Sequence, residues 1–185
     1  ESIRERTPMT PFPAPNRLHV WFARRPLVAS RAAILGSLLE AGADRKKFLY
    51  DLGIHGDPVG SRVRIDQARQ SGERFEGEAY TYSRAFTFSP PPLGRMPPAT
   101  VLDPTAGGGS IPFESARLDC KTLANDLNPV AALVLKATLE LPLEFGSELH
   151  KRFEILAAEF VKRRDQILQD LIPAEPFDNC FVTNW

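Results

Sequence analysis

Residues 100–110 read TVLDPTAGGGS, a short apolar stretch that ends at an acidic residue and runs into three consecutive glycines. The stretch 100–102 predicts a buried strand, and residues 111–118 predict a helix behind the glycines. A second strand is expected over 122–125, followed by a second helix for which Asn128 is a good N-cap. A strand, a glycine loop, a helix, a strand and a helix in this order form half of a doubly wound α/β sheet.

The segment in front of this sheet is expected to be mainly helical. Apolar spacing predicts an amphipathic helix over 27–41, a second helix that begins at Asp44, and a weaker third helix within 57–75. Residues 1–17 contain four prolines and are expected to be extended or disordered. The front of the chain therefore has no predicted strand.

Three parts follow from these patterns: an extended and helical region over 1–88, a proline-rich linker over 89–98, and the first half of a Rossmann-like domain over 99–185. In the last part, an apolar stripe at helical spacing runs over 149–171, for which core packing is the simpler interpretation and a partner helix the alternative. The predicted fold class is α/β, a partial Rossmann-like fold preceded by a helical N-terminal region. Only two strands are predicted, so the sheet is expected to be incomplete.

Composition excludes several classes of protein. The chain of 185 residues has no apolar run long enough to span a membrane, and its two cysteines are sixty residues apart with no CxxC motif. We therefore expect no disulfide framework and no metal site, and a cytoplasmic location.

The net charge is zero, but residues 1–72 carry 12 Lys/Arg and 7 Asp/Glu. The basic front is interpreted either as a phosphate-facing surface or as an ordinary solvated one.

The glycine loop predicts a ligand that carries adenosine. Consecutive glycines let the backbone approach a ligand closely, and Asp126, twenty-three residues after Asp103, is placed to accept hydrogen bonds from ribose hydroxyls. The loop opens with a carboxylate, which suits an ammonium and a sulfonium group but repels a pyrophosphate. It also lacks the Gly-Lys-Ser/Thr ending of a P-loop. S-adenosylmethionine therefore fits this pattern better than NAD or ATP.

Two longer motifs resemble those of a known family. The segments DPTAGGGSIPFESA (103–116) and NDLNPVA (125–131) are similar to motifs I and II of methyltransferases that modify amino groups in nucleic acids. The front segment LHVWFARRPLVASRA (18–32) resembles the opening motif of bacterial adenine-specific DNA methylases that have an N-terminal domain of unknown function, some of them linked to phage defence. The segment YSRAFT (82–87) is similar to the stretch that these proteins carry before motif I.

The resemblance implies an S-adenosylmethionine-dependent methyltransferase fold and a set of cofactor-binding residues. The loop residues that it implies are Asp103, Pro104, Thr105, Ala106, Gly107, Gly108 and Gly109. Asp126 would take the ribose hydroxyls, Leu127 would pack on the adenine, and the turn around Trp21, Arg24 and Arg25 would lie near the methionine carboxylate. From the residues alone, Arg25 at a helix start is either a carboxylate ligand or a surface arginine.

The chain lacks the motif that performs the chemistry in this family. An Asn or Asp, two prolines and an aromatic residue hold the target amine, and no such tetrapeptide occurs in the sequence. We therefore predict no catalytic residue here, and expect the chain to be the cofactor-binding portion of a DNA adenine-N6 methyltransferase. A truncated enzyme and a short subunit completed by a second protein chain are both open, with truncation favoured. Alternatives are an RNA guanine-N2 methyltransferase fragment and a non-catalytic, partner-binding module.

Overall fold

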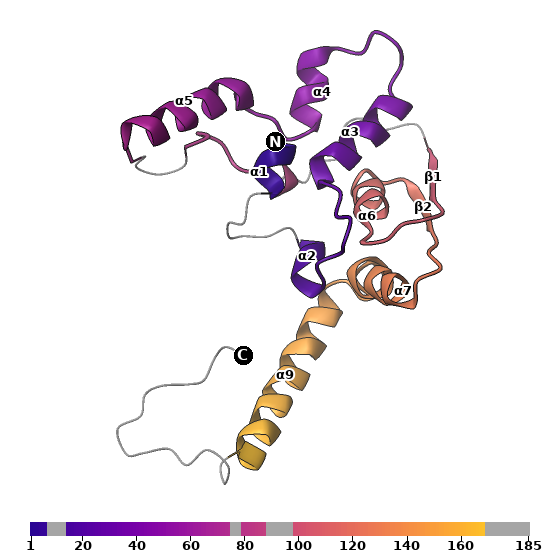
Figure 1. Cartoon of the computed structure of the whole chain (residues 1–185). Helices are drawn as coiled ribbons and strands as arrows, with labels where there is room; N and C mark the ends of the chain where they lie inside the picture. The colour runs from indigo at the N-terminus through magenta and orange to yellow at the C-terminus, as the bar shows by residue number, and fades with distance from the viewer. Residues whose placement is uncertain (7–13, 75–78, 88–97, 169–185) are drawn as a thin grey trace. The chain divides into compact units, whose positions relative to one another are not determined.

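The computed structural model describes residues 1–6, 14–74, 79–87 and 98–168. The chain divides into two compact units, Glu1–Glu140 (unit 1) and Leu141–Trp185 (unit 2), which we describe separately. The elements of unit 1 are α1 (Ser2–Arg6), α2 (Ala14–Leu18), α3 (Leu27–Leu38), α4 (Arg45–Asp51), α5 (Pro58–Ser71), a 3₁₀ turn η1 (Ala85–Thr87), β1 (Thr100–Asp103), α6 (Ser110–Arg117), β2 (Lys121–Ala124), α7 (Pro129–Leu135) and a π-helical segment η2 (Lys136–Glu140) (Figure 1).

Local capping rules account for three of the helix starts. The side chains of Asp44, Asp57 and Asn128 accept hydrogen bonds from backbone N–H groups in the first turns of α4, α5 and α7. A proline follows directly in α5 and α7, where its missing N–H costs nothing. The predicted helices at these positions are confirmed. The helix predicted over 27–41 is also present, but α3 ends at Leu38 because Leu39 is already extended.

The prediction of an extended or disordered start is wrong for α1 and α2. No proline interrupts the segment 2–6, and Pro15 lies in the first turn of α2, where its fixed φ suits a helix. The other prolines of this stretch lie outside the described residues, as does nearly all of the predicted linker 89–98. This linker falls within unit 1, which contains both the helical front and the strands.

The two strands and α6 form a parallel β–α–β unit. β1 pairs with β2 in a register that places Val101 beside Thr122 and Leu102 beside Leu123. The first pair faces α6, where the hydroxyl groups of Thr122 and Ser115 are 2.5 Å apart. The unit agrees with the predicted order of elements. A complete Rossmann-like fold stays a prediction, because the described residues contain one such unit.

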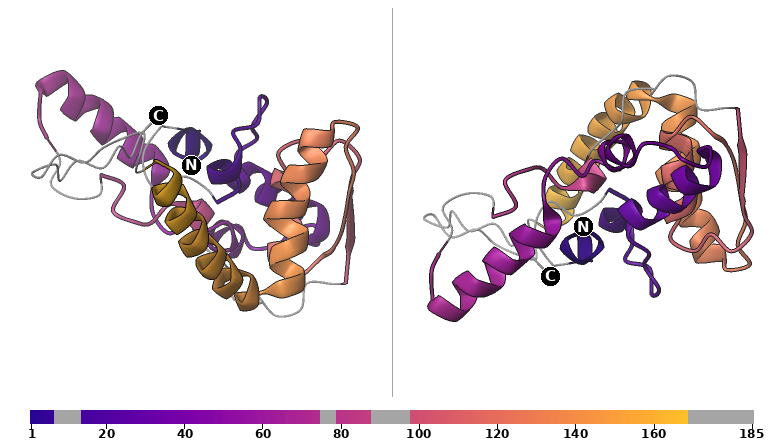
Figure 2. Two further views of the ribbon diagram at one scale, coloured as in Figure 1. Left: turned by 90° about the horizontal axis from the view of Figure 1, so that it is seen from below. Right: turned by 90° about the horizontal axis from the view of Figure 1, so that it is seen from above.

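The hydrophobic core lies between α3, α4, α6 and one face of the sheet. Its most buried members are Ile34, Leu35, Leu52, Leu118 and Cys120. α3 and α6 lie side by side in this core (Figures 1 and 2). Burial raises the pKa of the Cys120 thiol, which is free. Cys120 therefore serves as a small buried residue of the core, while Cys180 lies outside the described residues.

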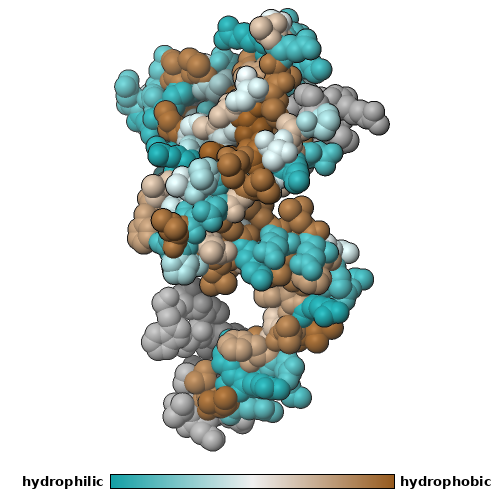
Figure 3. All heavy atoms as spheres, turned by 90° about the vertical axis from the view of Figure 1, so that its right-hand side faces the viewer, coloured by the Kyte–Doolittle hydropathy of each residue, from teal (hydrophilic) through white to brown (hydrophobic). Residues whose placement is uncertain are grey.

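The second face of the sheet is bare in the described part of the chain. Leu102 and Leu123 are 64% and 47% exposed, and both views of Figure 2 place the strands at the outer edge of unit 1 with its helices on one side only. In Figure 3, hydrophobic side chains gather on the face of unit 1 where the strands lie. Val130 and Leu133 in α7 are exposed as well. Parallel sheets are normally covered on both faces.

A buried ion pair joins α3 to α6. The guanidinium of Arg31 donates to both carboxylate oxygens of Glu114, at 2.6 and 3.2 Å, and both side chains are fully buried. Arg31 also donates to the backbone oxygens of Leu52 and Ala85. Arg117 donates to Glu114 at 3.0 Å and to the backbone oxygen of Phe86 at 2.9 Å. One carboxylate thus links α3, α6 and the segment before β1.

The first residues of the chain hold two other segments in place. The Glu5 carboxylate accepts from the N–H groups of Leu27 and Val28, at 2.6 and 3.2 Å, and so caps α3 from a distance. Burial raises the pKa of this carboxyl group, while the two N–H donors oppose the rise. Arg4 donates to the backbone oxygen of Tyr82 at 2.7 Å and lies over the Tyr82 ring. α1 thereby anchors the segment that leads to η1.

Unit 2 consists of α8 (Leu141–Phe145) and α9 (Ser147–Leu168) in its described part. The apolar stripe of α9 is exposed: Phe153, Leu156, Phe160 and Ile167 are each more than 60% accessible to solvent. The prediction that this stripe packs in a core is therefore wrong for these four residues. Among the helices of the described segments, none combines the length and the apolar character needed to cross a membrane.

We expect Glu114→Gln to destabilise unit 1 by about 3–5 kcal/mol, because the buried guanidinium of Arg31 loses its counter-charge. Urea unfolding followed by circular dichroism measures the loss. The matched control is Asp66→Asn, which makes the same change at the exposed Arg62–Asp66 pair and should leave the midpoint nearly unchanged. Equal midpoints for the two variants would show that the buried pair contributes nothing.

Candidate cofactor-binding site

The glycine loop links β1 to α6 through two left-handed residues. Gly107 has a φ of 51° and Gly109 a φ of 80°, which side chains rarely tolerate. The loop closes through a hydrogen bond of 2.8 Å from the Gly109 N–H to the backbone oxygen of Ala106. α6 begins at Ser110 directly behind this turn, so its first N–H groups and its positive dipole end lie next to the loop.

Asp126 holds the loop from the side of β2. One carboxylate oxygen accepts from the Gly107 N–H and the other from the Asn128 N–H, both at 2.8 Å. These two bonds lower the pKa of Asp126, so it is a carboxylate at neutral pH. Each oxygen keeps a further lone pair for another donor. Asp126 is therefore a loop-positioning residue that remains able to accept hydrogen bonds from a ligand.

Trp21 holds the loop from the side of the helical front. A Cβ atom added to Gly108 would lie 2.8 Å from the Cβ of Trp21, and one added to Gly107 would lie 2.6 Å from its indole nitrogen. The loop and Trp21 thus approach more closely than any side chain at these glycines would allow. Gly108 does not have a positive φ, so it is this close approach that requires a glycine there.

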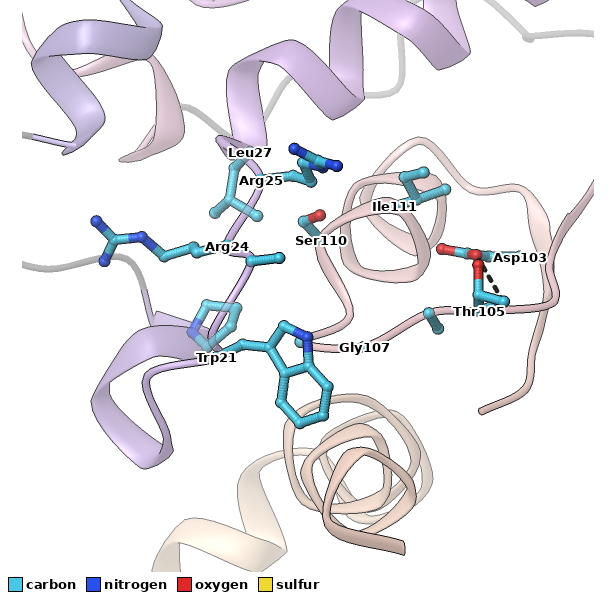
Figure 4. A pocket seen from close by; sticks show the side chains of 13 residues that line it. Trp21, Arg24, Arg25, Leu27, Asp103, Thr105, Gly107, Ser110 and Ile111 are labelled. Atoms are coloured by element: carbon cyan, nitrogen blue, oxygen red, sulfur yellow. Dashed lines mark hydrogen bonds between the residues drawn. The ribbon is translucent and has the colours of Figure 1, made fainter. Parts of the chain in front are cut away.

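A cavity of about 280 Å³ lies between the turn before α3 and the glycine loop. Its walls come from both segments: Pro15, Trp21, Ala23, Arg24, Arg25 and Leu27 on one side, and Asp103, Thr105, Ala106, Gly107, Gly108, Ser110 and Ile111 on the other. In Figure 4, Arg25 extends toward the side where Ser110 and Ile111 lie, and Arg24 extends the opposite way.

Opposite charges line this cavity. The Asp103 side chain is buried, and one of its oxygens accepts from the Thr105 N–H at 3.2 Å (Figure 4). Arg25, at the other wall, is exposed and stands two residues before α3. A carboxylate at one wall and a guanidinium at the other suit a small zwitterion, whose ammonium and carboxylate groups would find one partner each.

Six of the predicted site residues meet in the cavity walls: Asp103, Thr105, Ala106, Gly107, Gly108 and Arg25. Pro104, Gly109, Asp126 and Leu127 are not among the residues that line it. Gly109 caps α6 and Asp126 holds the loop, as described above. Leu127 is 98% exposed, so nothing in the described part of unit 1 covers it. The roles predicted for these ten residues in binding a cofactor stay predictions.

Sequence reasoning missed the charged residues that support the site. Arg31 stands on the same helical face as Leu27 and Leu35, four residues from each, and Glu114 stands between Ile111 and Leu118. Both charges lie at positions where the helical period predicts a core residue. This could have indicated a buried ion pair, because a charge in the core needs a buried partner. Glu5 gave no such signal, since its partners are backbone N–H groups.

Comparisons with known proteins give one match. Residues 1–52 match the model of a family described as a protein of unknown function (DUF1156). This stretch includes α1, α2, α3 and the turn that carries Trp21 and Arg25. The search of curated proteins found no match, and the search of solved structures found none either.

We expect Gly108→Val to displace Trp21 from the loop and to destabilise unit 1 by about 1–3 kcal/mol, because the new side chain has no room. In a Trp185→Phe background, Trp21 is the remaining tryptophan, so a red shift of its emission reports the displacement. Gly36→Val in α3 is the control, since a Cβ there meets nothing within 4 Å. Unchanged emission and stability in Gly108→Val would mean that the loop is not held by Trp21.

Proposed function

We propose that unit 1 binds S-adenosylmethionine and is the cofactor-binding portion of a DNA adenine-N6 methyltransferase. The observation that carries the proposal is the meeting of two distant segments, the turn at residues 21–25 and the loop at residues 103–110, around one cavity. In the sequence, these two segments are the ones that resemble the methylase motifs. A chance glycine turn has no reason to face that particular segment.

The residues in the walls fit the amino-acid end of this cofactor. Asp103 would accept hydrogen bonds from its ammonium group, and Arg25 would pair with its carboxylate. The backbone at Gly107 and Gly108 has no side chain to keep a ligand away. The cofactor supplies a methyl group on a sulfonium centre, and the carboxylate of Asp103 favours a positive charge nearby. A cavity of about 280 Å³ is suited to this end of the molecule alone.

The adenosine end would lie outside the cavity, on the side of β2. Asp126 is ionised and keeps free lone pairs, so it would accept from the ribose hydroxyls while it still holds Gly107. Leu127 offers an uncovered apolar side chain on which an adenine ring would rest. This side is open, so we expect the affinity to be lower than that of a methyltransferase with a complete sheet.

The rest of the enzyme is proposed to come from outside the described residues. Parallel sheets are normally covered on both faces, so the bare face at Leu102 and Leu123 favours further apolar elements packed on it. The two strands also have open edges at which further strands could pair. We propose that a second protein chain or a further segment supplies these strands together with the residues that hold the target base. DNA would be the substrate of the complete enzyme, and the proposed setting is the cytoplasm.

We expect isothermal titration calorimetry to detect binding of S-adenosylmethionine or S-adenosylhomocysteine, and Asp126→Ala to weaken it about tenfold or more. The variant loses the ribose acceptor and the bond that holds Gly107, each of them a charge-assisted hydrogen bond. Asp44→Ala is the matched control, because it also removes an aspartate that accepts from a backbone N–H group, but at the start of α4, which contributes no residue to the cavity walls. Equal affinity in wild type and Asp126→Ala would refute the ribose role.

We expect the 185-residue chain to transfer no methyl group to DNA or RNA. It lacks the tetrapeptide that aligns the target nitrogen with the methyl group, and positioning of that kind supplies roughly 7–11 kcal/mol of a barrier. A radiolabelled-methyl assay with adenine-containing duplex DNA and with structured RNA checks this. Robust incorporation of label would mean that another residue of this chain holds the target base, and the chain would then be an enzyme by itself.

A further inference from the structure

The turn between α2 and α3 presents an exposed aromatic ring beside the cavity. Phe22 is 90% exposed, so nearly the whole of its ring is accessible to solvent. It follows directly after Trp21, whose indole lies against the glycine loop. The rings of Trp21 and Phe22 meet edge to face, with centroids 5.6 Å apart and an angle of 64° between their planes.

This contact fixes the place of Phe22. Trp21 cannot move toward the loop, because its atoms already lie where side chains of Gly107 and Gly108 would be. The His19 ring also lies near the indole, with ring centroids 6.1 Å apart. The Phe22 ring therefore packs on an indole that itself lies against the backbone of the glycine loop and lines the cavity. A merely accidental exposed side chain would lack such support.

The stretch of chain that carries this ring is basic, and the buried Glu5 is an acidic group that interacts with its Arg24. Residues 17–25 include Arg17, Arg24 and Arg25, and contain no acidic residue. Arg24 extends away from the Ser110 side of the cavity, and Arg17 in α2 is exposed. The bare sheet face differs from this surface, because it centres on Leu102 and Leu123, which offer no ring for stacking. The exposed rings of α9, Phe153 and Phe160, differ as well, because the same helix carries Glu154 and Glu159 beside them.

We propose that Phe22, Arg17 and Arg24 bind unpaired nucleic acid, with a base stacked on the ring and phosphates at the two guanidinium groups. Aromatic rings stack on any base, and cations along the same path pair with the backbone. A purely apolar patch would fit a protein partner, whereas an aromatic ring between arginines fits an anionic polymer with flat bases. The inference rests on the proposed function and adds to it the part of unit 1 that would contact the substrate strand beside the methyl donor.

The test uses the whole chain and a short single-stranded DNA that contains 2-aminopurine, a fluorescent analogue of adenine. Fluorescence anisotropy measures affinity, and quenching of the analogue measures stacking. We expect Phe22→Ala to bind about 5- to 150-fold more weakly and to lose the quenching. Phe22→Trp should restore both. Val20→Ala is the matched control, because Val20 is also exposed, at 67%, but has no ring; it should bind like the wild type.

A second variant tests the charge. Arg24→Gln should reduce the steepness with which affinity falls as salt rises, by about 0.7 in the logarithmic slope, which is the effect of one lost phosphate contact on a single strand. Absence of DNA binding at low salt, full binding by Phe22→Ala, or an equal loss in Val20→Ala would each overturn the proposal. The last of these would indicate that apolar surface in general, and not the aromatic ring, contributes to DNA binding.

Cofactor titrations separate this inference from the proposed function. Phe22→Ala and Val20→Ala should bind S-adenosylmethionine as the wild type does, because neither residue lines the cavity. If no variant binds the cofactor but the DNA results follow the expected order, the proposed function fails and the nucleic-acid surface stands. If the cofactor binds but Phe22→Ala leaves DNA binding intact, the nucleic-acid surface fails by itself.

Discussion

One buried pair of opposite charges, Arg31 and Glu114, supports the whole of unit 1. The two residues are 83 positions apart, and each would be severely destabilising in the core without the other. Their contact places α3 against α6, and other hydrogen bonds of Arg31 and Arg117 attach the end of α4 and η1 to the same point. Hydrophobic contact alone would allow these helices to slide, whereas a bidentate pair permits one register.

The candidate site follows from this arrangement. The turn with Trp21 precedes α3, and the glycine loop precedes α6, so aligning the two helices also brings their N-terminal ends together. The loop is then held from both sides, by the Asp126 carboxylate and by the Trp21 indole. A backbone restrained in this way loses little freedom when a ligand binds, which is the ordinary advantage of a preformed site. Glu5 adds to the restraint, because it caps the same end of α3.

Local signals in the sequence predicted the elements well. Asp44, Asp57 and Asn128 mark helix starts through hydrogen bonds with near neighbours, and the glycines mark a turn, so no distant partner is needed to recognise them. The burial of individual side chains was harder to predict, because it depends on which element packs against them. Val130 in α7 and Phe153 in α9 have regular helical spacing, yet are exposed in the described structure. The periodicity identifies an apolar face but does not say what covers it.

The site was predictable in part for the same reason. Asp103 and the glycines belong to one continuous stretch, whereas the opposite wall comes from a turn almost eighty residues earlier. Sequence alone suggested Arg25 through a resemblance, without placing it against the loop. The contact between Trp21 and Gly108 could not be inferred, because it depends on the angle between α3 and α6. That angle is set by side chains that sequence reasoning did not single out.

The bare sheet also bears on how this chain behaves at high concentration. Each strand is only four residues long, and each has one edge whose backbone groups have no strand beside them in the described segments. Such edges invite unwanted pairing between copies, but here Asp103 ends one strand and Lys121 begins the other. A short strand with a charge at one end can form few backbone hydrogen bonds with a strand that pairs in the wrong register. The sheet is thereby protected against random aggregation while it stays open to a strand of matching register.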